Sequence, residues 1–156
     1  MRLSYPSRMA QDLKENKVGK GEYLVYSGIF LVSVIWSLAL ILDWSPYVYE
    51  YSWLRILDIV LILTTGLGTI AIAYLINKKG DGRRFWYRYI SLYASAFVFT
   101  TLIALVLGVL LVGVDILYGS NVPQNTYDLG GFLLEVVLSI LFFFLIAKYM
   151  RVVSAP

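Results

Sequence analysis

The chain has 156 residues, of which 60% are hydrophobic and 15% are charged, and its mean hydropathy is +0.75. A soluble domain of this size carries more charge, so the composition predicts a membrane protein. The absence of cysteine and histidine excludes disulfides, thiol catalysis and imidazole chemistry, and we expect no metal and no other cofactor. The formal charge of +3 does not indicate nucleic acid, because the basic residues flank apolar segments and fit membrane topology instead.

Residues 1–21 form a polar segment in which basic and acidic side chains alternate. A short helix beginning near Pro6 would carry Met9 and Leu13 on one side and would be interrupted at Gly19. A helix that lies on the membrane surface is therefore one interpretation. We favour a loosely ordered cytoplasmic tail, because polar chain ends are commonly poorly ordered.

Four apolar segments follow, each long enough to cross a bilayer core as a helix, which takes about 20 residues. They cover residues 22–43, 52–77, 84–118 and 128–149. The third is longer than the core requires, so its basic first turns are expected to project into the headgroup region. The predicted fold is an all-α membrane protein with one domain, residues 22–150. It is an antiparallel bundle of four transmembrane helices, followed by a short tail at 151–156.

The distribution of Lys and Arg predicts the orientation of this bundle. Every Lys and Arg except Arg55 lies before residue 23, between 78 and 88, or from 148 onward. Basic segments remain on the cytoplasmic side of a membrane, so both termini are expected to be cytoplasmic. We expect a bacterial-type cytoplasmic membrane. The basic cluster expected at the lipid headgroups consists of Lys78, Lys79, Arg83, Arg84 and Arg88.

The connector between the second and third segments has the sequence of a tight turn. Gly80 suits the position just after a helix, and Asp81 suits the N-cap of the next one. Aromatic rings are expected at both membrane interfaces, because they combine an apolar body with a polar edge. On the cytoplasmic side these are Phe85, Trp86, Tyr87 and Tyr89.

Small side chains predict where the helices pack, because association in lipid depends on close contact. They recur every four residues in the third segment, while bulky residues such as Phe97 on its other positions are expected to face lipid. The expected packing residues are Ser33, Ser37, Gly66, Gly68, Ala96, Thr100, Ala104 and Gly108. A flexible or gated site at the two middle glycines is the alternative interpretation of the same pattern.

Three acidic residues fall inside the predicted spans, toward the end opposite the basic cluster. Asp58 and Glu135 each lie roughly 10 Å along their helices, and Asp115 lies one turn before the end of the third span. Each shares a helix face with small or polar residues, and Arg55 lies one turn before Asp58, where it can form an ion pair. The candidate polar pocket consists of Arg55, Asp58, Thr65, Thr69, Asp115, Glu135 and Ser139.

Two interpretations of these acids remain open. Intramembrane carboxylates cost about 2.5–3.5 kcal/mol each near the helix centre, which favours a site for a proton, a cation or a small polar solute. The structural interpretation is that Asp58 and Glu135 lie in early helical turns, where the macrodipole stabilises acids. Asp115 fits that explanation least, because it is near a helix C-terminus. A continuous ion path is not expected, since the inner half of the fourth span is apolar.

No motif for a catalytic site, a phosphate or a metal is present, so we expect a protein that is not an enzyme. The leading hypothesis is a small polytopic protein that acts through partners in the membrane, as an accessory, assembly, regulatory or immunity-type subunit. Other membrane proteins or a second copy of the chain are the expected partners, besides the lipid bilayer. The alternative is a small transporter or channel subunit with an outward-facing acidic pocket. A membrane-embedded enzyme is a third hypothesis.

Overall fold

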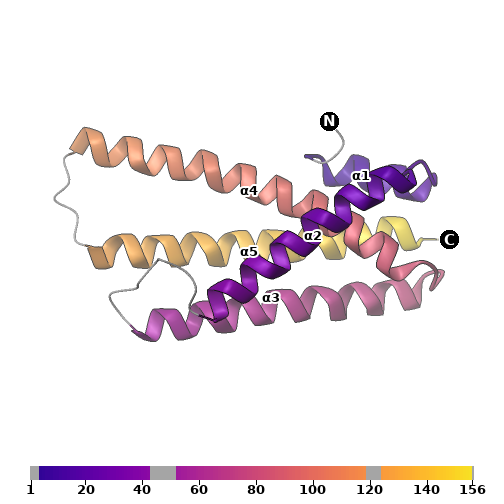
Figure 1. The fold of residues 1–156 in the computed structure, drawn as a ribbon, viewed down its shortest axis with the longest axis horizontal. Helices are drawn as coiled ribbons and strands as arrows, with labels where there is room; N and C mark the ends of the chain where they lie inside the picture. The colour runs from indigo at the N-terminus through magenta and orange to yellow at the C-terminus, as the bar shows by residue number, and fades with distance from the viewer. Residues whose placement is uncertain (1–3, 43–51, 119–123, 156) are drawn as a thin grey trace.

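The computed structural model describes residues 4–42, 52–118 and 124–155, and within them it contains five helices and no strand (Figure 1). The side chains of residues 52, 111–112, 114–118 and 124–126 lie outside this description. The all-α prediction is therefore confirmed for the described chain. The helices are α1 (Pro6–Lys14), α2 (Lys20–Ile41), α3 (Ser52–Lys79), α4 (Phe85–Tyr118) and α5 (Gln124–Ser154).

Four of these helices, α2 to α5, are long and apolar enough to cross a membrane. They cover the four apolar segments of the sequence, so the prediction of a helical membrane protein is confirmed at this level. The predicted tail at 151–156 is wrong in one respect, because α5 continues to Ser154. Val153 and Ser154 are each 2% exposed, and this burial holds the last turn of the helix in place.

Helix α1 and the last turn of α5 lie at the same end of the bundle as the α3–α4 turn, and we call this end the basic end (Figure 1). Helix α5 is central and packs along α3 and α4, whereas α2 crosses α4 obliquely and touches α3 only slightly. Helix α4 diverges from α5 toward the opposite end, which we call the far end. The helices therefore pack most closely at the basic end.

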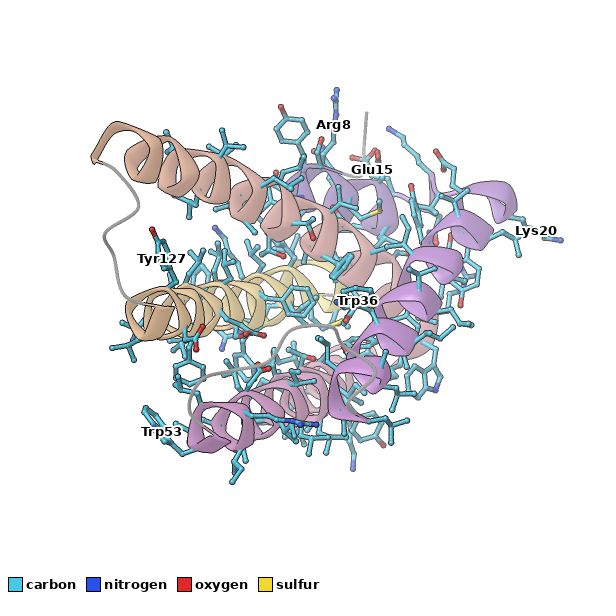
Figure 2. All side chains as sticks on the ribbon, turned by 60° about the vertical axis from the view of Figure 1, so that its left-hand side comes forward. Arg8, Glu15, Lys20, Trp36, Trp53 and Tyr127 are labelled. Atoms are coloured by element: carbon cyan, nitrogen blue, oxygen red, sulfur yellow. The ribbon has the colours of Figure 1, made fainter. Side chains whose placement is uncertain are left out.

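The buried core lies in the half of the bundle near the basic end. Its largest fully buried side chains include Tyr89, Leu92, Ile146 and Met150. The expectation that Tyr89 lies at the membrane interface is wrong, because the ring is 1% exposed and its hydroxyl is hydrogen bonded to Thr69 at 3.1 Å. In contrast, Trp36 and Trp53 are at least half exposed, as lipid-facing side chains are, and Trp53 lies at the outer edge of the bundle (Figure 2).

The N-terminal segment is an ordered helix, which corrects the favoured expectation of a loosely ordered tail. Helix α1 packs against α4 and α5 and buries Met9, Ala10 and Leu13 almost completely. Burying a side chain the size of Met9 contributes about 1.5–3 kcal/mol, and the burial of all three side chains offsets part of the conformational entropy lost when the helix is ordered. Asn16, with a φ of 53°, reverses the chain after α1, a conformation that asparagine tolerates.

The turn between α3 and α4 also differs from the expectation. Gly80 directly follows α3, which ends at Lys79, as predicted, but the left-handed glycine is Gly82, with a φ of 68°. Helix α4 begins at Phe85, so Asp81 is not its N-cap. Gly80 also packs directly on the last turn of α5. A Cβ atom at this position would lie 2.1 Å from the carbonyl oxygen of Ser154.

Candidate functional site

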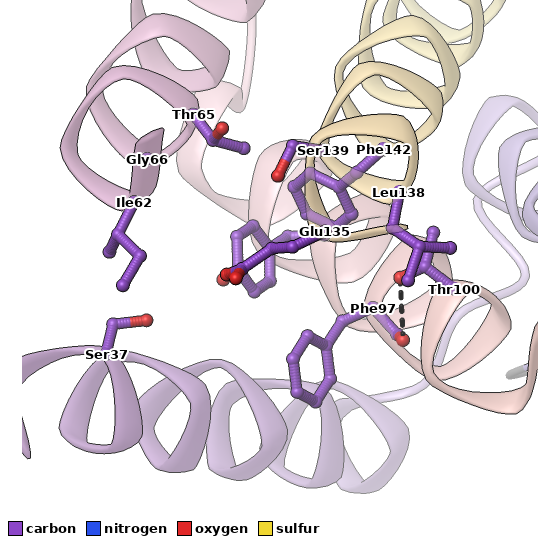
Figure 3. Close-up of a pocket in the computed structure, with 11 residues that line it drawn as sticks. Ser37, Ile62, Thr65, Gly66, Phe97, Thr100, Glu135, Leu138, Ser139 and Phe142 are labelled. Carbon is purple, nitrogen blue, oxygen red and sulfur yellow. Dashed lines mark hydrogen bonds between the residues drawn. The ribbon is translucent and has the colours of Figure 1, made fainter. Parts of the chain in front are cut away.

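A cavity of about 190 Å³ lies between the four long helices, near the middle of the bundle. Residues from all four helices line it, which is why no single segment of the sequence predicts its shape (Figure 3). The lining residues are Ser37 of α2; Ile62, Thr65 and Gly66 of α3; Tyr93, Phe97 and Thr100 of α4; and Glu135, Leu138, Ser139 and Phe142 of α5.

Two acidic side chains meet at this cavity. Glu135 extends from α5 into the space between the helices (Figure 3), and its carboxyl group lies near that of Asp58 on α3. Ionised carboxylates can only accept hydrogen bonds, so a hydrogen bond between the two groups would need a shared proton. Asp58 is 9% exposed, and its Oδ1 atom is buried with no hydrogen-bond partner among the described residues. We call Asp58 and Glu135 the carboxyl pair.

Aromatic rings close the cavity on the side toward the basic end. Tyr93 of α4 lies edge-on to Phe142 of α5, with ring centroids 5.0 Å apart, and edge-on to Phe30 of α2 at 4.9 Å. The Tyr93 hydroxyl is held by a hydrogen bond of 3.1 Å with Ser33. Beyond this layer lies the buried core around Tyr89. The cavity is therefore blocked by tightly packed rings in the direction of the basic end.

No protein-family model, no curated protein and no solved structure matches this chain. Function is therefore inferred from the chemistry of the cavity and of the surfaces around it.

The structure brings together part of the predicted polar pocket. Thr65 and Ser139 line the cavity with Glu135, and Asp58 lies next to Glu135 without lining the cavity itself. Thr69 does not reach the cavity, because its hydroxyl is directed to Tyr89 and to the Gly66 carbonyl.

The expected roles of Asp115 and Arg55 in the pocket stay predictions. The side chain of Asp115 lies outside the described residues. Arg55 is half-buried, and its ion pair with Asp58 stays a prediction. Asp128, the first residue of the fourth predicted span, is fully buried in an early turn of α5.

The predicted packing residues divide into three groups. Ser33 and Ala96 are buried between helices, and a Cβ atom on Gly68 would lie 3.3 Å from the Phe143 ring. Ser37, Gly66 and Thr100 line the cavity instead, with Thr100 Oγ1 bonded to the Ala96 carbonyl at 3.0 Å. Ala104 is half-buried, and a Cβ atom on Gly108 would have no neighbour within 4 Å.

The sequence did not predict the aromatic wall of the cavity. Phe97 was expected to face lipid, but it lines the cavity because α4 packs against both α2 and α5. Tyr93 lies four residues before Phe97 and therefore on the same helix face, where the two rings stack with centroids 6.3 Å apart. The four-residue spacing of these two aromatic residues was the sequence signal that could have predicted the aromatic wall.

A polar network fixes the basic end of the bundle. Arg88 pairs with Asp81, with Nη2 2.6 Å from Oδ2, and this hydrogen-bonded partner lowers the pKa of Asp81 to about 2. Arg88 also donates to Asn77 at 3.1 Å, and Asn77 accepts a second hydrogen bond from Ser154. Within the predicted basic cluster, Arg88 is thus an internal side chain, whereas Lys78, Lys79 and Arg83 are exposed. Arg84 is exposed too and donates to Asn16.

Proposed function

We propose that this chain is a non-catalytic membrane protein that binds a small organic cation of the alkylammonium class beside Asp58 and Glu135. Binding displaces the proton that the two carboxyls share. The observation that carries this proposal is the pair of neighbouring carboxyl groups at a cavity lined by all four long helices. Two neighbouring carboxyl groups are costly to bury, which favours a role in binding.

The surroundings of the carboxyl pair favour an organic cation. Carboxylates attract a positive charge, and aromatic faces such as those of Tyr93, Phe97 and Phe142 add cation–π attraction. A divalent metal is less well matched, because calcium prefers six to eight oxygen ligands. In the described ranges no three acidic groups come close enough to hold a metal ion.

The distribution of charge supports an orientation in which both termini and the basic end are cytoplasmic. In that orientation the aromatic layer separates the cavity from the cytoplasm, and the solute enters from the far side. This arrangement supports binding or exchange by a transporter or sensor subunit, and it does not favour a continuous channel.

Direct titration tests the proposal. Full-length protein in lipid nanodiscs is titrated with tetramethylammonium, methylammonium and sodium by isothermal calorimetry. We expect saturable binding of the two ammonium ions, with a dissociation constant of about 1 mM or lower, and weaker binding of sodium, which loses more hydration. Glu15→Gln, a change at an exposed carboxylate near the basic end, serves as the matched control and leaves binding unchanged. Absence of saturable binding by either ammonium ion contradicts the proposal.

A second candidate function is to act through another membrane protein whose helix packs against α4. The part of α4 toward the far end favours it. The small-residue series continues past the last buried position to Ala104 and Gly108, where the described chain supplies no close neighbour to the glycine. Small residues at this spacing allow another helix to approach closely. A membrane-embedded subunit of another protein, or a second copy of the chain, would fit there.

Cysteine crosslinking in native membranes tests this candidate, because the chain has no cysteine of its own. We expect a Gly108→Cys variant to give a discrete crosslinked product with a membrane-permeant bifunctional reagent. Val32→Cys, at a 66% exposed position on α2, is the matched lipid-facing control and should give none. Equal products from both positions, or none from either, would remove the argument for a partner at α4.

A further inference from the structure

A second cavity, of about 420 Å³, lies at the basic end between the last turns of α3 and α5. It is separate from the cavity at the carboxyl pair and shares no lining residue with it. Its lining combines basic, apolar and backbone groups. The residues are Ile72, Leu75, Ile76, Lys79 and Gly80 on one side, and Arg151, Ser154 and Ala155 on the other.

Two cations border this cavity, one from each helix. Lys79 and Arg151 are both exposed, and within the described ranges neither takes part in an ion pair with a carboxylate. The acid of the adjacent turn, Asp81, is already bound by Arg88. Two uncompensated positive charges therefore lie at one opening, where an anion would be attracted to both.

The cavity wall away from the basic end is apolar. Ile72, Leu75 and Ile76 follow α3 from the two cations toward the middle of the bundle, and Leu75 is 51% exposed. A free phosphate ion would contact only the basic part and would leave this wall uncovered. A ligand with a charged head and a hydrocarbon chain covers both parts.

We propose that this cavity binds an anionic phospholipid, whose phosphate lies between Lys79 and Arg151 and whose acyl chain lies along Ile72 and Leu75. Basic pockets between transmembrane helices recognise acidic headgroups in this way, and Arg matches the planar geometry of phosphate oxygens. The close approach of Gly80 to Ser154 holds α3 and α5 at a fixed spacing, so the two cations are positioned before the lipid arrives.

Native mass spectrometry of the full-length protein tests this site. Purified protein is mixed with phosphatidylglycerol, with phosphatidylcholine of the same acyl chains, or with glycerol phosphate, which has the headgroup chemistry but no chains. We expect roughly tenfold stronger retention of phosphatidylglycerol than of phosphatidylcholine, and no retention of glycerol phosphate. The double variant Lys79→Gln/Arg151→Gln should lose this preference, whereas Lys20→Gln, a change at an exposed lysine outside the cavity, should keep it.

The apolar wall provides an independent readout. A Leu75→Ala variant, which keeps both cations, should retain phosphatidylglycerol less well than the unmodified protein. Equal retention of the two phospholipids, unchanged preference in the double variant, or binding of glycerol phosphate as strong as that of the lipid each overturns the proposal. Circular dichroism of every variant confirms that a lost preference is not a loss of fold.

Discussion

Replacing Glu135 by glutamine is expected to weaken alkylammonium binding by about tenfold or more, because removing the charged partner of a charge-assisted contact costs about 1.5–3 kcal/mol. Glu135 is the member of the carboxyl pair that lines the cavity, and its carboxyl group points into it (Figure 3). Glutamine keeps the size of the side chain and can still hydrogen bond to Asp58. The expected loss of affinity therefore reports the removed charge and not a change in the volume of the cavity. Calorimetric titration with tetramethylammonium measures it.

Replacing the other member of the carboxyl pair is expected to weaken cation binding by a smaller amount. Asp58 does not line the cavity and acts on the cation through Glu135, so Asp58→Asn should bind more weakly than the unmodified protein and more tightly than Glu135→Gln. Ser139→Ala removes a neutral hydroxyl from the same wall and should have a smaller effect. Wild-type affinity in the Glu135→Gln variant would show that the carboxyl pair does not bind the cation.

Replacing Gly80 by alanine is expected to reduce the free energy of unfolding by about 1–3 kcal/mol, the usual cost of overpacking a tight contact. The added Cβ atom would lie 2.1 Å from the Ser154 carbonyl oxygen, which is backbone and cannot rotate away. Relief of this clash would break the hydrogen bonds that Ser154 makes with Asp81 N–H and with Asn77, each 3.2 Å long. Thermal unfolding in one detergent measures the change.

Gly28→Ala is the matched control. Gly28 lies within α2, and a Cβ atom there would meet no atom within 4 Å. Alanine is favoured over glycine in a helix by about 1 kcal/mol, so this variant should be as stable as the unmodified protein or more so. An unfolding temperature of Gly80→Ala equal to that of Gly28→Ala would mean that α3 and α5 do not approach as closely as the structure shows.

The four spans were predictable because a membrane imposes a length and an apolar composition on each helix, and both are properties of local sequence. The features that were missed depend on segments far apart in the chain. Gly80 meets Ser154 only in the folded bundle, and helix α1 is ordered by its burial against α4 and α5. The sequence of residues 1–21 is mostly polar, so it does not by itself predict that this segment packs against other helices.

The parts of the candidate site that depend only on which face of a helix a residue occupies were predictable from the sequence. Asp58 and Glu135 were both expected on inward faces, and the structure places their carboxyls in contact. Phase alone does not reveal depth relative to other helices, so Thr69, eleven residues after Asp58, was assigned to the pocket but lies in the core with Tyr89. The aromatic wall depends on how α2 crosses α4, and no local pattern in either helix encodes that crossing.

Counting the protons released when tetramethylammonium binds tests the central claim most directly. Full-length protein in nanodiscs, in weakly buffered solution near neutral pH with a pH indicator, is saturated with the cation. The shared proton of Asp58 and Glu135 predicts release of about one proton for each cation bound, and no release from Glu135→Gln under the same conditions. Saturable binding of the cation without any release of protons would contradict the account.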